Sequence, residues 1–161
     1  MKFEIELLNY DEWTRTKIIE KITDSKLLDE IARIGKTEAH AVAENINTSA
    51  ETLSLLAKHK NSYVRIATAR NKNVSIETLA ELAEDEDPVV KASVAANHKT
   101  TVELLYKLEK EFTAIVLMNP NITKDSLLKY KDSKDKHLRK IANKRLRWLE
   151  NIEHWKVYYY S

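Results

Sequence analysis

The residues whose types could do chemistry gather near the C-terminal end of the chain. Between residues 122 and 147 there are ten Lys or Arg and three Asp, a local net charge of +7 in a chain whose formal total is +2. The aromatic residues that follow are Trp148, Trp155, Tyr158, Tyr159 and Tyr160. Cations neutralise nucleic-acid phosphates and aromatic rings stack on bases, so this segment could form a nucleic-acid interface.

A second interpretation of the basic segment is structural, and we favour it. A helix that closes the end of a repeat array needs an apolar face toward the array and a polar face toward solvent. A basic polar face, with aromatic residues over the last unit, fits that role. The candidate contact residues under the first interpretation are Lys136, Arg139, Lys140, Lys144, Arg145 and Arg147.

Catalysis and metal binding have no recognisable pattern in the 161 residues. The absence of cysteine excludes disulfides, thiolate zinc sites, iron–sulfur clusters and cysteine nucleophiles. None of the five histidines is spaced three or four residues from another, as helical metal ligands are. The acidic run at residues 84–87 lacks the alternating spacing and the glycine of a calcium loop. We therefore expect no enzyme, no cofactor and no metal.

A repeat of 26 residues organises the chain and must position any functional residue. Asn45, Asn71 and Asn97 mark it, each with an alanine two residues earlier and a Ser or Thr four residues later. The leucine pairs that complete the units are Leu53 and Leu56, Leu79 and Leu82, and Leu105 and Leu108. A fixed period of this length is typical of a solenoid, whose units bury their apolar faces only by stacking on their neighbours.

Each unit is predicted to contain two short helices, neither of which would be stable alone in water. The first, for example residues 64–71, is rich in alanine, and the second, for example residues 76–83, places its leucines on one face. The residues expected to cap these helices are Ser49, Ser75, Thr101 and Thr123 for the second helices and Asn61 and Asp87 for the first. The asparagine that ends each first helix suits a turn, because asparagine tolerates left-handed backbone.

The stretch from Val64 to Asp85 resembles the leucine-rich repeat variant family. That family's motif runs Val-Arg, Ala, Asn, then Glu, Leu, Leu-Ala and an acid, and it returns here from Val90 to Asn97. The resemblance covers residues 39–130 and implies short helices wound into a right-handed superhelix, with the first helix of each pair either α or 3₁₀. HEAT-like repeats, which have longer helices, are the near neighbour. The family's prototype carries an iron–sulfur cluster on cysteines, so no cofactor carries over to this chain.

We expect one all-α domain over residues 1–161, a right-handed α-solenoid of about five two-helix repeats of 22–26 residues. Residues 1–37 would form an atypical N-terminal cap and first repeat, residues 38–132 the repeats, and residues 133–161 a capping helix and tail. The unit after Asn97 is shortened between Leu108 and Phe112. In the terminal helix, expected at residues 135–153, the candidate buried residues are Leu138, Ile141, Leu146 and Trp148.

The expected function is that of a cytoplasmic scaffold that binds a protein or peptide, with nucleic-acid binding through the basic end as the alternative. The N-terminal residues include acids where a signal peptide needs an apolar stretch, and no run approaches the roughly 18 apolar residues of a membrane span. Solenoids present an extended surface built from equivalent positions of successive units. Arg65, Arg70 and Lys91 are expected to be exposed on such a surface. The partner, the face used and the oligomeric state stay open.

Overall fold

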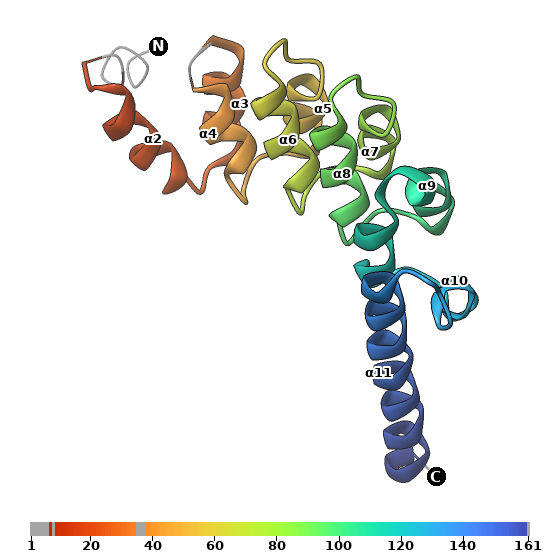
Figure 1. The fold of residues 1–161 in the computed structure, drawn as a ribbon. Helices are drawn as coiled ribbons and strands as arrows, with labels where there is room; N and C mark the ends of the chain where they lie inside the picture. The colour runs from red at the N-terminus through yellow and green to blue at the C-terminus, as the bar shows by residue number, and fades with distance from the viewer. Residues whose placement is uncertain (1–6, 8, 35–37, 161) are drawn as a thin grey trace.

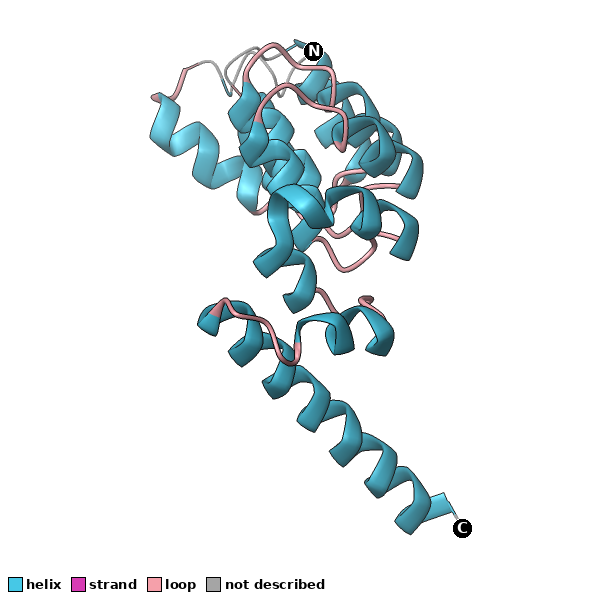
Figure 2. Ribbon diagram, turned by 45° about the vertical axis from the view of Figure 1, so that its right-hand side comes forward, coloured by secondary structure: helices cyan, strands magenta, loops and turns pink. Residues whose placement is uncertain are grey.

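All regular structure in the described residues is helical, which confirms the all-α class (Figures 1 and 2). The computed structural model describes residues 7, 9–34 and 38–160, with side chains for these residues except Ile34 and residues 153–160. The helices are α2 (Glu12–Glu20), α3 (Ser25–Ile34), α4 (Ala39–Glu44), α5 (Ala50–Leu56), α6 (Ser62–Arg70), α7 (Ile76–Leu82), α8 (Pro88–Ala96), α9 (Val102–Met118), α10 (Lys124–Tyr130) and α11 (Lys136–Tyr160). No helix in this part of the chain is long and apolar enough to cross a membrane.

The helices follow one another along a bent row (Figure 1). Helices α2, α4, α6, α8, the last turns of α9 and then α11 lie on the inner side of the bend, and we call them the inner helices. Helices α3, α5, α7, the first turns of α9 and α10 lie on the other side and are called the outer helices. Neighbouring inner helices pack against each other, α4 on α6, α6 on α8 and α8 on α9. The inner helices α4, α6 and α8 are α-helical, which answers the question of α or 3₁₀.

The core consists of the leucines that the repeat predicted, together with small and branched residues of the inner helices. All six of the repeat leucines between residues 53 and 108 are buried, as expected. The apolar residues of α8, α9 and α10 form one cluster that also includes Leu146 of α11. Leu138 and Ile141 pack against this cluster and are partly buried. The expectation that Trp148 is buried is wrong, because 53% of its surface is exposed.

The predicted caps are confirmed. The side chains of Ser49, Ser75, Thr101 and Thr123 each accept a hydrogen bond from a backbone N–H in the first turn of an outer helix. Asn61 and Asp87 cap α6 and α8 in the same way, and Pro88 stands in the first turn of α8. These bonds satisfy donors that a short helix would otherwise leave free. They fix where each short helix begins.

The shortened unit is visible as a kink in α9. Phe112 has a non-helical backbone (φ −124°, ψ 40°), so the helix consists of an outer part and an inner part joined at this residue. The loss predicted between Leu108 and Phe112 explains the join, because the chain passes into the inner helix without the loop that separates α7 from α8. After α10, the chain enters α11, where the Asp135 carboxylate accepts hydrogen bonds from the backbone N–H groups of His137 and Leu138.

Helix α11 is longer than the predicted terminal helix, which was expected to end near residue 153. It has 25 residues, and its first turns pack on α9 and α10. The later turns extend away from the row (Figure 1). The beginning of α11 therefore serves as one more inner helix of the row.

Candidate binding surface on the inner helices

The asparagines that mark the repeat join successive units through their side chains. The Nδ2 group of Asn71 donates to the carbonyl oxygens of Ala43 and Asn45, both at 2.8 Å. Its Oδ1 atom accepts a hydrogen bond from the backbone N–H of Asn73. We call the set Asn45, Asn71, Asn97 and Asn119 the asparagine ladder, since each member bonds the preceding unit in this way. The ladder holds the ends of the inner helices in register.

These asparagines stand at turns, as expected, but the left-handed backbone that we gave as the reason for asparagine there is not found. Asn45, Asn71, Asn97 and Asn119 all have extended backbone, with φ between −64° and −70°. No residue that the structure describes has a positive φ. Asparagine is needed at these positions for its side-chain amide. The Nδ2 group donates hydrogen bonds to two buried carbonyl oxygens, and the Oδ1 atom accepts one from a backbone N–H.

Arg145 occupies the next position of the ladder. It lies 26 residues after Asn119, and its Nη2 group donates to the Asn119 carbonyl oxygen at 3.1 Å. The guanidinium also lies over the Trp148 ring, 5.3 Å from the ring centre. Arg145 was a candidate nucleic-acid contact, and the structure instead gives it a partner in the protein backbone. It ties α11 to the end of the ladder.

Arg65 is also engaged within the protein, and the expectation that it is exposed is wrong. Only 9% of its surface is accessible. Its guanidinium pairs with both carboxylate oxygens of Asp85 at 2.7 and 2.9 Å and donates to the His59 carbonyl at 2.9 Å. A planar guanidinium can satisfy all these acceptors at once, which compensates for the loss of water. Arg65 therefore connects two neighbouring inter-helix loops.

The ion pair changes the acid–base properties of both partners. The hydrogen bond to Asp85 raises the pKa of Arg65 above its usual value. Burial by itself would raise the pKa of Asp85, but the hydrogen bonds from Arg65 and from the Asp87 backbone outweigh burial and lower it. Both groups are therefore held in their charged forms.

Two other candidates occupy positions equivalent to Arg65 in later units. Lys91 pairs through Nζ with Glu111 at 2.9 Å. Arg139 is partly buried and donates through Nη1 to the Ser133 carbonyl at 2.6 Å. These contacts give both side chains a structural role.

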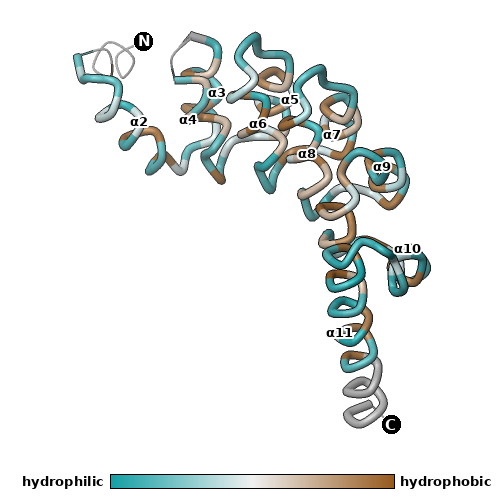
Figure 3. The backbone as a smooth tube through the Cα atoms, in the orientation of Figure 1, coloured by the Kyte–Doolittle hydropathy of each residue, from teal (hydrophilic) through white to brown (hydrophobic). Residues whose placement is uncertain are grey.

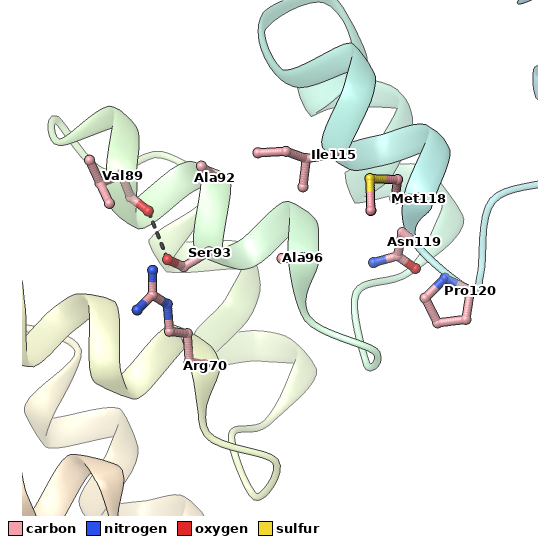
Figure 4. Close-up of a pocket in the computed structure, with 9 residues that line it drawn as sticks. All are labelled: Arg70, Val89, Ala92, Ser93, Ala96, Ile115, Met118, Asn119 and Pro120. Atoms are coloured by element: carbon pink, nitrogen blue, oxygen red, sulfur yellow. Dashed lines mark hydrogen bonds between the residues drawn. The ribbon is translucent and has the colours of Figure 1, made fainter. Parts of the chain in front are cut away.

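Three adjoining hollows run along the inner helices from α4 to α11, and we call them together the inner groove. The N-terminal hollow, of about 280 Å³, is lined by His40, Glu44, Tyr63, Ile66, Ala67, Arg70 and Asn71. The central hollow, of about 400 Å³, is lined by Arg70, Val89, Ala92, Ser93, Ala96, Ile115, Met118, Asn119 and Pro120 (Figure 4). The C-terminal hollow, of about 510 Å³, is lined by Met118, His137, Lys140, Ile141, Lys144, Arg145 and Trp148. Arg70 borders both the N-terminal and the central hollow, and Met118 borders both the central and the C-terminal hollow, so each hollow adjoins the next.

The central hollow is mostly apolar. Figure 4 shows Ala92 and Ala96 on α8 next to Ile115 and Met118 on α9, with Val89 farther along α8 beside Ser93. Val89 is 49% exposed and Met118 is 63% exposed, large fractions for apolar side chains. The one serine, Ser93, donates its hydroxyl hydrogen bond to the Val89 carbonyl at 2.8 Å. In Figure 3, α8 and the end of α9 have mainly hydrophobic colouring, whereas α11 has mainly hydrophilic colouring.

The cations of the groove lie on the two sides of the central hollow. Lys140 and Lys144 are exposed on α11 beside the C-terminal hollow, and Arg70 is exposed at the border of the other two. Glu44 is the only acid among the lining residues, and it lies 3.6 Å from the His40 ring nitrogen. The groove is therefore net positive. No group of three or more potential metal ligands occurs in the part of the chain that the structure describes.

The structure brings only some of the predicted contact residues into the groove. Arg70, Lys140, Lys144 and Arg145 line it, whereas Lys136 and Arg147 are exposed on α11 outside its lining. The side chains of Trp155 and of residues 158–160 lie outside the described part of the chain.

Sequence reasoning missed Tyr63, Val89 and Met118. A usable signal existed for two of them, since Tyr63 and Val89 are apolar residues 26 positions apart, each one residue before the first buried valine of an inner helix. Comparison of the chain with family models, with curated protein sequences and with solved structures found no match.

Proposed function

We propose that the chain is a non-catalytic helical-repeat scaffold that binds a protein or peptide along the inner groove. Its architecture in this proposal is a right-handed α-solenoid of the leucine-rich repeat variant or HEAT-like type. The regular spacing of the asparagine ladder and the packing of equivalent inner helices support that architecture.

One observation carries the binding function. Adjoining hollows on five successive inner helices, from α4 to α11, form the inner groove, whose floor exposes Val89 and Met118 to solvent. A solenoid has no structural need for exposed apolar side chains on its inner face, and such patches commonly mark interaction sites. Burial of this floor against a partner's apolar side chains would provide the driving force for binding.

The lining of the groove supports a role without catalysis. His40 has Glu44 beside it, but neither Ser, Thr nor Lys adjoins them as a nucleophile in the N-terminal hollow. The carboxylate near His137 is that of Asp135, which accepts hydrogen bonds from backbone N–H groups at the start of α11 and is not among the residues that line the C-terminal hollow. A catalytic acid, base or nucleophile needs such a neighbour to set its pKa and orientation.

Nucleic-acid binding is the second candidate, and the surface of α11 favours it. Lys136, Lys140, Lys144 and Arg147 are exposed and spaced by four, four and three residues, so they share one face of the helix. An electrostatic interface of this kind would lose affinity steeply as salt rises.

The test is reconstitution with a purified partner. Proteins that co-purify with the chain from its own cells would be expressed separately, and binding would be measured by titration calorimetry at two salt concentrations. We expect a protein partner whose affinity falls when Met118 is replaced by Gln, with duplex and single-stranded oligonucleotides unbound. Oligonucleotide binding without any purified protein partner would favour the second candidate, and turnover of a metabolite would contradict both.

A further inference from the structure

We infer that the inner groove binds an acidic amphipathic segment of a partner protein. The segment's apolar side chains would fill the central hollow, and its carboxylates would face Arg70 on one side and Lys140 and Lys144 on the other. This inference rests on the proposed function and adds the chemistry of the partner.

The apolar half of the inference comes from the floor of the central hollow. Ala92 and Ala96 present small side chains between the larger Val89, Ile115 and Met118, so the hollow between α8 and α9 has room for a side chain from outside (Figure 4). A hollow of about 400 Å³ can take one or two aliphatic or aromatic residues. No charged group lies between Val89 and Met118 in the lining of this hollow other than Arg70 at its border.

The acidic half comes from the charges along the groove. Lys140 and Lys144 lie one helical turn apart on α11 and border Ile141 and Trp148, so a bound carboxylate would have an apolar surface beside it. Arg70 supplies a further cation at the opposite border of the central hollow. Cations at these positions would attract the carboxylates of the bound segment. They would fix where the segment lies along the groove and increase its association rate.

The acids near the groove do not cancel this charge. Glu44 lies beside His40 at the far end of the N-terminal hollow. Glu111, the last residue of the outer part of α9 before the join at Phe112, is neutralised by its ion pair with Lys91. The cations of the C-terminal hollow therefore face the ligand without a competing carboxylate among the lining residues.

A peptide fits the groove better than a nucleic acid does. A nucleic-acid backbone that followed the groove would place phosphates over the central hollow, where the single serine hydroxyl already donates to the Val89 carbonyl. Phosphates without donors or cations lose their hydration without compensation. A peptide can place apolar side chains there and keep its charges at the two ends.

The inference is tested by selection and then by paired variants of the full chain. Random peptides displayed on phage are selected against the wild-type protein, and the enriched peptides are synthesised with a fluorescent label for anisotropy titrations. Two double variants change the groove, Lys140→Glu with Lys144→Glu and Val89→Gln with Met118→Gln. Two matched variants make the same changes away from the groove, Lys58→Glu with Lys129→Glu and Leu55→Gln with Leu128→Gln; Lys58 lies just after α5, and the other three residues lie on the outer helices α5 and α10. All the replaced side chains are exposed on the surface, so the variants should fold, and circular dichroism checks that they do.

We expect the enriched peptides to combine Asp or Glu with large apolar residues. Each groove variant should weaken their binding at least about tenfold, whereas the outer variants should change it less than about twofold. Peptides with Lys in place of the acids should bind the Lys140→Glu, Lys144→Glu variant better than they bind the wild type.

Other outcomes separate the inference from the function on which it rests. Enriched peptides without an acidic preference, or peptides whose binding is unchanged by the groove variants, would overturn the acidic-ligand inference and leave peptide binding intact. Failure to enrich any peptide, with or without binding of duplex or single-stranded oligonucleotides, would overturn both.

Discussion

The Nδ2 atom of Asn71 lies 2.8 Å from the carbonyl oxygen of Asn45, 26 residues earlier in the chain, and the carbonyl oxygen of Asn71 accepts in turn from Asn97 at 3.3 Å. The side chains of Asn45, Asn71 and Asn97 are all buried. Each ladder asparagine is thus a donor to one unit and an acceptor for the next. Because the units share these bonds, loss of one asparagine weakens the junction between two units.

Replacing Asn71 by Ala should destabilise the protein strongly. The change removes both amide hydrogen bonds and leaves the carbonyls of Ala43 and Asn45 buried without their partner, at a cost of about 2–4 kcal/mol. Urea denaturation followed by circular dichroism measures this cost. Asn73→Ala is the matched control, because Asn73 also bonds the preceding unit but is only half-buried, and its cost should be clearly smaller. Equal costs would contradict the role given to the ladder.

Replacing Asn71 by Asp should give a pH-dependent defect. The new carboxylate would face two carbonyl oxygens in a buried site, so its pKa should be raised above the ordinary value. A raised carboxyl pKa means that the folded variant gains a proton as pH falls, so its stability relative to the wild type should recover on acidification. Unfolding free energies of both proteins measured between neutral and mildly acidic pH test this. A difference that stays constant with pH would argue against burial of the amide.

Removal of the buried ion pair should also destabilise the protein. Arg65→Ala leaves the Asp85 carboxylate without its main partner, at a cost of about 2–4 kcal/mol. Lys58→Ala is the control. It changes an exposed lysine between α5 and α6 and should alter stability by less than about 0.5 kcal/mol. Thermal melts of the two variants provide the comparison, and similar melting temperatures would show that the pair contributes little.

The same pair should influence acid unfolding. The pKa of Asp85 is lowered from 3.8, so its stabilising contribution is complete above that value and is lost as pH falls through the lower folded-state pKa. Asp85→Asn removes this contribution, and the stability difference between wild type and variant should shrink below about pH 4. Denaturation measured across that range gives the result. A difference that grows on acidification would have the wrong sign for a lowered pKa.

Arg145 and its neighbour Lys144 should behave differently when neutralised. Arg145→Gln removes the donor to the Asn119 carbonyl and should loosen the attachment of α11, costing about 1–2 kcal/mol. Lys144→Gln changes an exposed side chain and should cost less than about 0.5 kcal/mol, while it weakens binding in the groove. If Arg145→Gln has no effect on stability, Arg145 belongs with the contact residues instead.

The sequence allowed the packing of the fold to be predicted, because packing follows local rules. The buried leucines and the capping hydroxyls lie within the same short segment as the helix they serve, so spacing alone identified them. The function of the ladder asparagines could not be predicted in that way. Their acceptors are main-chain carbonyls in the preceding unit, and a carbonyl has no signature in the sequence.

The candidate site was predicted less well for a related reason. Arg65 was expected to be exposed because arginine usually is, but Asp85, 20 residues away, permits its burial. Trp148 was expected to be buried because it is large and apolar, yet it lines the groove and stacks under Arg145. In both cases a contact between distant residues outweighs the usual preference of the residue type.

The ladder also bears on how such a chain could have lengthened. An asparagine that bonds only main-chain oxygens does not depend on which side chains the neighbouring unit carries. Asn119 makes the same two bonds across a unit of 22 residues that Asn97 makes across 26, so the junction tolerates even a change in unit length. A duplicated unit inserted between two others would find its acceptors already in place. The junction is thus suited to growth by tandem duplication, with the side chains of each copy then free to diverge toward a new ligand.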